Sequence, residues 1–243
     1  MYRNKAAVST PWLSACIAFS LASLVGCGGG EGTAPVDAEG NPTATARSAK
    51  EEAALARLFP GWGDLGRYAN DPQFQHATPK VPIVVDGVRL PPEAIQRFNG
   101  QPVIYLMNEE SQEGGFVYVF STHQKLRAHL EARGKMPRLD GGDVSAMDET
   151  PAIFYADPGL TGWEIRFSRG TEVPNLTSHS VNWFWNWNDQ ISSLAAANVG
   201  TYTVLYQNSN YWGTEVWTAA GTSRYDLGWI NYDNQASSIR VLP

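Results

Sequence analysis

Cysteine is nearly absent from this chain. It has two cysteines, Cys16 and Cys27, and both stand close to the N-terminus. The remaining sequence offers no pair of thiols for an internal disulfide, so its core has to hold by packing, with bound metal as the other available support. Basic residues are also few: 18 Lys and Arg against 24 Asp and Glu give a formal net charge of −6. This balance argues against nucleic acid as a partner, which needs a basic face, and it suits hard cations.

An apolar run long enough to cross a membrane is missing from the N-terminal region. Residues 12–25 are apolar and follow Arg3 and Lys5, but glycines follow at once. A spanning helix needs roughly 20 apolar residues, so this layout predicts a removable secretory signal peptide over residues 1–26.

The end of this segment, Leu24-Val25-Gly26-Cys27, resembles the bacterial lipobox. The resemblance implies that Cys27 becomes the acylated first residue of the mature chain and attaches the protein to a membrane of the cell envelope through its lipid, with palmitate among the acyl groups. An ordinary signal peptide with an incidental cysteine is the alternative. Gly28 stands where an aspartate would retain a lipoprotein at the inner membrane of a Gram-negative cell, so we expect the outer membrane there.

Composition divides the rest of the chain into four regions. Residues 27–43 are rich in Gly, Ala, Pro and Thr, which is typical of a disordered tether. Residues 44–137 are predicted to hold a helix, over 44–59, and then a small α/β module. Residues 138–150 form an acidic, glycine-containing linker. A domain boundary is expected near residue 150, before the all-β region of residues 151–243.

The small module is predicted over residues 81–137 in the order ββαββα. Asp86-Gly87 between two short apolar runs is a strong hairpin signal. A helix is expected from Pro91 to about Phe98, then β-rich runs at 103–107 and 116–121 separated by a turn over 109–115. The last element is a helix from His123 to Arg133 with Thr122 as its cap. No motif in the module assigns it a function.

The region after residue 150 repeats itself, and the repeat determines the expected architecture. Each copy places a tyrosine and a glycine at the same spacing, Tyr155 with Gly162 and Tyr206 with Gly213. Each copy ends in a second shared stretch, residues 188–193 (NDQISS) in the first and residues 233–238 (DNQASS) in the second. Short β-rich runs broken by Gly, Pro and Asn predict an antiparallel sandwich here.

The two paired elements resemble the hallmarks of the βγ-crystallin Greek key: an aromatic-x6-Gly hairpin and the calcium-binding stretch N/D-N/D-x-x-S/T-S. The resemblance covers residues 151–243. It implies an all-β, two-Greek-key βγ-crystallin-like sandwich there, and with the module predicted before it the overall fold class is a small α+β N-terminal module followed by this sandwich. One such stretch alone is weak evidence for the resemblance, but two stretches in register with two hairpins are strong evidence.

The resemblance also implies up to two Ca²⁺ sites, in which the serine of each stretch crosses to the site of the other. Calcium takes oxygen ligands from carboxylates, amides, hydroxyls and main-chain carbonyls, and both stretches offer all of these. Carbonyls of the hairpins near Asp157 and Asn208 are expected to add to them. The expected ligands are Asn188, Asp189, Gln190 through its carbonyl, Ser192, Asp233, Asn234, Gln235 through its carbonyl and Ser237.

Two features limit the expected affinity. Each site has about one carboxylate, Asp189 or Asp233, which predicts micromolar or weaker binding because affinity rises with ligand charge. Ala236 stands where the first copy has Ile191, so the second stretch is expected to be looser. Degenerate sites in a correctly formed fold, as in vertebrate lens crystallins, are the alternative.

Other residues that carry chemistry have simpler interpretations. Trp183, Trp185 and Trp187 alternate and would share one face of a strand, for packing against the fold or for binding sugar. The four histidines are interpreted as surface or internally satisfied side chains, since His123 and His129 lack zinc-helix spacing. The acidic residues in loops have no nucleophile or catalytic motif near them, so no enzyme is predicted.

These observations favour a non-enzymatic, calcium-binding envelope lipoprotein whose metal stabilises the crystallin-like domain. A metalloproteinase inhibitor of the same fold is one alternative, although such inhibitors lean on disulfides. Surface adhesion through the tryptophans is another. The membrane, through lipid on Cys27, and Ca²⁺ are the expected partners, with any protein or glycan partner unassigned.

Overall fold

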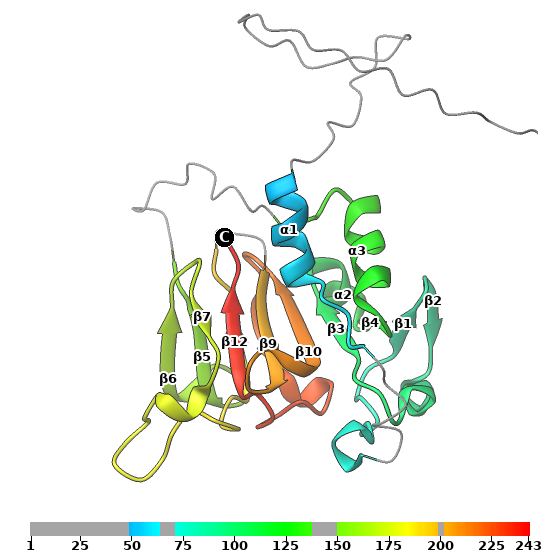
Figure 1. The fold of residues 1–243 in the computed structure, drawn as a ribbon. Coiled ribbons are helices and arrows are strands. Elements are labelled where there is room, and N and C mark those ends of the chain that lie inside the picture. The colour runs from blue at the N-terminus through cyan, green and yellow to red at the C-terminus, as the bar shows by residue number, and fades with distance from the viewer. Residues whose placement is uncertain (1–48, 64–70, 138–149, 199–201) are drawn as a thin grey trace, which may run out of the picture. The chain divides into compact units, whose positions relative to one another are not determined.

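A computed structural model describes residues 49–63, 71–137, 150–198 and 202–243, all of which belong to the compact unit Arg47–Pro243 (Figure 1). Two sheets carry this unit. The larger sheet has eight strands in the order β2 (Val88–Leu90), β1 (Ile83–Val85), β4 (Val117–Phe120), β3 (Ile104–Met107), β10 (Trp212–Ala219), β9 (Tyr202–Asn208), β12 (Ser238–Val241) and β7 (Glu172–Val173). The smaller sheet has four, in the order β11 (Ser223–Asp226), β8 (Ser193–Ala195), β5 (Ala152–Asp157) and β6 (Thr161–Phe167).

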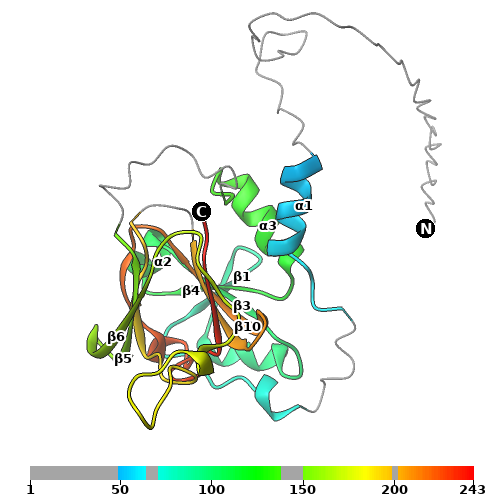
Figure 2. The ribbon, with the colours of Figure 1, turned by 60° about the vertical axis from the view of Figure 1, so that its left-hand side comes forward.

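The helices lie mainly in the N-terminal half. They are α1 (Ala49–Leu58), α2 (Glu109–Gly114), α3 (His123–Ala132) and the 3₁₀ helices η2 (Pro72–Phe74), η3 (Pro92–Phe98), η4 (Leu176–Ser178) and η5 (Leu227–Trp229). No helix of the described ranges is long and apolar enough to cross a membrane. Helix α1 lies beside α3, with Arg127 Nη2 3.2 Å from Glu52 Oε1 (Figure 2).

Most of the elements predicted from the sequence are confirmed. The β1–β2 pair closes over Asp86-Gly87, and Thr122 caps α3 by accepting a hydrogen bond from the Lys125 amide. The predicted helix before β3 is of the 3₁₀ type. The turn predicted over residues 109–115 is wrong: Asn108 and Ser111 form a reciprocal capping box that starts α2, and Gly115 ends it in the left-handed region.

The sheet runs without a break from the N-terminal module into the crystallin-like region. Strands β3 and β10 pair in parallel, with Ile104 opposite Glu215 and Met107 opposite Thr218. Both faces of this junction are buried, because alternate side chains along a strand point to opposite faces. On β10, Val216 joins the core between the two sheets and Trp217 joins the core under α1 and α3. The predicted linker, residues 138–150, lies outside the described residues except for Thr150, and the signal segment, Cys27 and the tether lie outside them entirely.

The strand predicted for the tryptophans is wrong. Residues 179–187 form a tight turn with one bridge, between Ser180 and Asn186. The side chain of Asn182 accepts hydrogen bonds from the main-chain amides of Phe184 and Trp185, which bends the chain out of an extended conformation. As a result only Trp187 is buried, while Trp183 and Trp185 are exposed.

Candidate metal centre

Each motif begins with a hairpin that folds back on its own sheet. In β5–β6, Gly162 has φ +82°, and a Cβ there would lie 2.4 Å from Asp157 Oδ2. In β9–β10, Gly213 has φ +94°, and a Cβ would lie 2.8 Å from Asn208 Nδ2 and 3.2 Å from Gln207 Cβ. Both positions need glycine for its left-handed conformation and for the space. The two aromatic-x6-Gly hairpins predicted from the sequence are therefore formed.

A buried serine locks each hairpin to its stretch. Ser193 Oγ donates to the carbonyl of Asp157 at 2.7 Å and accepts from the amide of Leu160 at 3.0 Å. The second motif repeats the bonds at 2.6 and 3.0 Å with Ser238, Asn208 and Tyr211. These final serines of the two stretches were not among the predicted ligands, although the repeated Ser-Ser pair was a signal of their role.

The two stretches meet each other reciprocally. Asp189 Oδ1 accepts a hydrogen bond from Ser237 Oγ at 3.3 Å, and Asn234 Oδ1 accepts one from Ser192 Oγ at 3.2 Å. Their main chains cross as well, since the Asp189 amide donates to the Ala236 carbonyl and the Asn234 amide to that of Ile191, both at 3.0 Å. Each serine thus reaches the stretch of the other motif, as the resemblance implies.

The backbone at both crossing points adopts the same unusual conformation. Asp189 has φ +54° and Asn234 has φ +55°, in the left-handed region that Asp and Asn tolerate better than most residues. Ile191 and Ala236 are both fully buried beneath the stretches. The smaller Ala236 therefore still occupies the core position that Ile191 fills in the first copy.

Partial burial governs the electrostatics of Asp189. Desolvation raises the pKa of its carboxyl group, and hydrogen bonds from Ser237 and Asn188 oppose this shift. The Asn188 side-chain amide lies 2.6 Å from Asp189 Oδ2. Both of these partners of the Asp189 carboxylate, Ser237 and Asn188, are uncharged.

The crossing pairs have donor chemistry that fits calcium. Calcium–oxygen distances are about 2.3–2.6 Å. Two oxygens 3.2–3.3 Å apart, as in the Ser–Asn and Ser–Asp pairs, can therefore both contact one ion. Among the residues that the structure describes, no three His, Cys, Asp or Glu side chains gather closely enough to hold a metal ion, so carboxylate-rich sites are not seen there.

The other predicted ligands flank these pairs. Gln190 Nε2 donates to the carbonyls of Asp189 and Asn188, and Gln235 Nε2 donates to that of Asn231, so both glutamine side chains fold back on the main chain. Asp233 is exposed at the start of the second stretch. The Gln190 side chain thus touches the main chain of Asp189 and not the paired side-chain oxygens, and the ligand roles of Gln190, Gln235 and Asp233 stay predictions.

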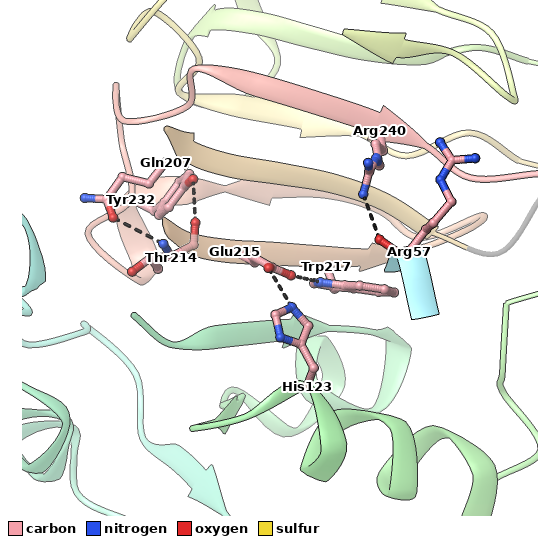
Figure 3. Close-up of polar contacts among 8 residues, drawn as sticks. All are labelled: Arg57, His123, Gln207, Thr214, Glu215, Trp217, Tyr232 and Arg240. Atoms are coloured by element: carbon pink, nitrogen blue, oxygen red, sulfur yellow. Dashed lines mark hydrogen bonds and ion pairs between the residues drawn. The ribbon is translucent and has the colours of Figure 1, made fainter. Parts of the chain in front are cut away.

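Sequence reasoning missed a buried polar network beside β10 (Figure 3). Glu215 Oε1 lies 2.8 Å from Nε2 of His123, and Glu215 Oε2 accepts from the Trp217 indole at 2.7 Å. Both His123 and Glu215 are buried. This network joins α3 to the crystallin-like region. It gives His123 Nε2 an internal partner, whereas His123 Nδ1 is buried without a hydrogen bond, so the prediction of a satisfied histidine holds for one ring nitrogen alone. Nothing in the sequence near His123 signals a partner so far along the chain.

Comparisons with known proteins find likeness in solved structures. No protein-family model matches the chain, and no curated protein sequence matches it. The solved structures are βγ-crystallin domains, from microbes among others. One from Ciona intestinalis has 17% identity, covers 38% of this chain and 99% of its own, with a TM-score of 0.31. One from an archaeon has 22% identity, 38% and 96% coverage and a TM-score of 0.30. One from Flavobacterium johnsoniae has 29% identity, 37% and 90% coverage and a TM-score of 0.28.

Proposed function

We propose that residues 151–243 bind calcium through the two reciprocal crossings, and that the chain is a non-enzymatic, lipid-anchored protein of the cell envelope. The observation that carries the calcium proposal is the pairing of Asp189 with Ser237 and of Asn234 with Ser192. Each pair brings together oxygens from two motifs that are far apart in the sequence. An ion bound at each crossing would therefore contact both motifs and stabilise their association.

The nature of the oxygens supports calcium over softer metals. The two stretches supply a carboxylate, amide oxygens and hydroxyls, and calcium binds such hard oxygen ligands, whereas zinc prefers nitrogen and sulfur. Each crossing has few formal charges, so affinity in the micromolar range or weaker is expected. An ion that binds only the folded form stabilises the domain by mass action.

The membrane part of the proposal depends on the sequence before residue 49. Cys27 follows a lipobox-like triplet, and the stretch after it has the composition of a flexible tether. Acylation of Cys27 would hold the folded unit at an envelope membrane, the outer one if the cell has two. Mass spectrometry of the protein from its own membranes would test this, because the mature chain should begin at an acylated Cys27.

Calcium titration by calorimetry tests the metal sites. We expect saturable binding of up to two ions, which the double variant Asp189→Ala/Asp233→Ala abolishes because it removes the only carboxylates of both stretches. The variant Asp226→Ala is a poor control because Asp226 caps η5. Glu164→Ala, which removes an exposed carboxylate from β6 outside both stretches, should bind calcium as the wild-type chain does. Equal binding by the wild-type chain and the double variant would overturn the assignment.

A further inference from the structure

The tightest cluster of exposed aromatic side chains lies at the tip of the turn formed by residues 179–187, here called the aromatic tip. Trp183 is 98% exposed, Phe184 91% and Trp185 63%. The loop that carries them projects from the fold just after η4, at the end of the unit remote from α1 (Figures 1 and 2, yellow). Three consecutive large apolar side chains held in water are costly unless they meet an apolar partner.

The main chain of the aromatic tip is hydrogen-bonded within itself. The carbonyl of Trp185 accepts from the amides of Val181 and Asn182, at 2.8 and 3.2 Å. Asn182 Oδ1 accepts from the amides of Phe184 and Trp185, at 2.9 and 3.1 Å. Four main-chain amides and the Trp185 carbonyl are therefore satisfied before any partner arrives, which lowers the cost of moving this part of the tip from water to an apolar phase.

The tip is an addition to the repeat. From Leu176 to Asp189 the first motif takes a longer path than the second motif takes from Leu227 to Asn234, and the additional residues fall in the turn. The second motif makes the same hairpin lock and the same crossing without a tip. The fold therefore does not need the aromatic tip, which points to a role outside the fold.

Charge is absent from the whole segment around the tip. No Asp, Glu, Lys or Arg occurs between Glu172 and Asp189, whereas charged residues make up 17% of the chain. A sugar-binding aromatic platform also needs polar groups aimed at its ligand, and here the Asn182 oxygen already accepts from two main-chain amides. Tryptophan is enriched where lipid headgroups meet acyl chains, because its ring is apolar and its N–H is polar.

We propose that the aromatic tip inserts into the headgroup boundary of a lipid bilayer, with Trp183, Phe184 and Trp185 as the inserting side chains. The contact is shallow and uncharged, so it does not require anionic lipid. It is independent of Cys27 and of calcium. A lipid-anchored chain would gain a second attachment that sets the orientation of the folded unit on a membrane.

A single fluorescent label tests insertion directly. The chain has two cysteines, so the full chain with Cys16→Ser and Cys27→Ser accepts one new thiol. Phe184→Cys carries an environment-sensitive dye at the tip, and Val88→Cys carries it at an exposed site on β2 as the matched control. With phosphatidylcholine vesicles, we expect a blue shift and quenching by brominated lipid at position 184 and neither at position 88. A dye at 184 that stays in water on bound protein would overturn the proposal.

Vesicle flotation gives an independent measure. In the same cysteine-free background, we expect Trp183→Ser/Phe184→Ser/Trp185→Ser to bind phosphatidylcholine vesicles at least about tenfold more weakly. The melting temperature should stay nearly unchanged because these side chains are mostly exposed. Val88→Ser should bind as the parent does. Phosphatidylglycerol should not strengthen binding. Equal binding by the triple variant, or tip-dependent retention on a glycan array without any vesicle binding, would reject insertion.

Discussion

At the scale of single residues, the two crossing points differ in charge, because one copy has Asp189 where the other has Asn234. The two side chains occupy equivalent places, since each accepts from the serine of the opposite stretch and each adopts a left-handed backbone. Sequence alone predicted both residues because the repeat aligns them. It did not predict that desolvation would raise the pKa of Asp189, because burial depends on the folded neighbours.

Asp189→Asn should separate the needs of the fold from the needs of the ion. A raised pKa means that the folded state holds the ionised carboxyl less readily than the unfolded state, so above the folded pKa this charge costs stability and the cost disappears as the pH falls. Without calcium at neutral pH, we therefore expect Asp189→Asn to raise the melting temperature slightly. With calcium, we expect the variant to lose the stabilisation that an ion at the Asp189–Ser237 crossing provides. Thermal melts with calcium and with chelator measure both. A lower melting temperature of the variant in chelator would contradict the pKa direction.

At the scale of elements, the structure agrees with the prediction for the two hairpins and disagrees with it for the tryptophan segment. A tyrosine, a glycine and a repeat specify a folded hairpin because the glycine meets a steric need that can be stated from the chain alone. The alternation of Trp183, Trp185 and Trp187 matched a strand, but Asn182 supplied a side-chain acceptor that the periodicity does not weigh. Helix α2 was missed for a related reason, since its capping box is made by a pair of short polar side chains.

Gly213→Ala should destabilise the hairpin more than Gly221→Ala. Both glycines have positive φ, so alanine is strained at either position, by about 1–2 kcal/mol. At Gly221 an added Cβ meets nothing within 4 Å, whereas at Gly213 it meets Asn208 Nδ2 at 2.8 Å and Gln207 Cβ at 3.2 Å. We expect a clearly lower urea midpoint for Gly213→Ala. Equal urea midpoints would mean that Asn208 and Gln207 move away from the added Cβ without loss of stability. The positive φ would then be the reason for glycine at position 213.

At the scale of the whole molecule, the pairing of β3 with β10 joins parts that the sequence presents as separate. Each strand has a local sequence pattern that predicts it, but no local pattern predicts a parallel pairing between two strands so far apart in the chain. The buried contact of His123 with Glu215 is equally non-local, and it fastens α3 to the same strand. The pairing and the contact place the N-terminal module where β10 would otherwise be an open edge, which is a liability for a β-rich domain.

This joint predicts that the two halves unfold together. Glu215→Leu leaves the buried His123 Nε2 and Trp217 Nε1 without their acceptor, so we expect the free energy of unfolding to fall by about 3–5 kcal/mol. Glu164→Leu removes an exposed carboxylate from β6 and should change it by less than about 1 kcal/mol. Hydrogen exchange followed by mass spectrometry should show the amides of β4 and of β9 losing protection by the same amount in Glu215→Leu, because the sheet that contains both opens as one cooperative unit. Loss of protection in β4 alone would instead mean that the N-terminal module detaches while the crystallin-like sandwich stays folded.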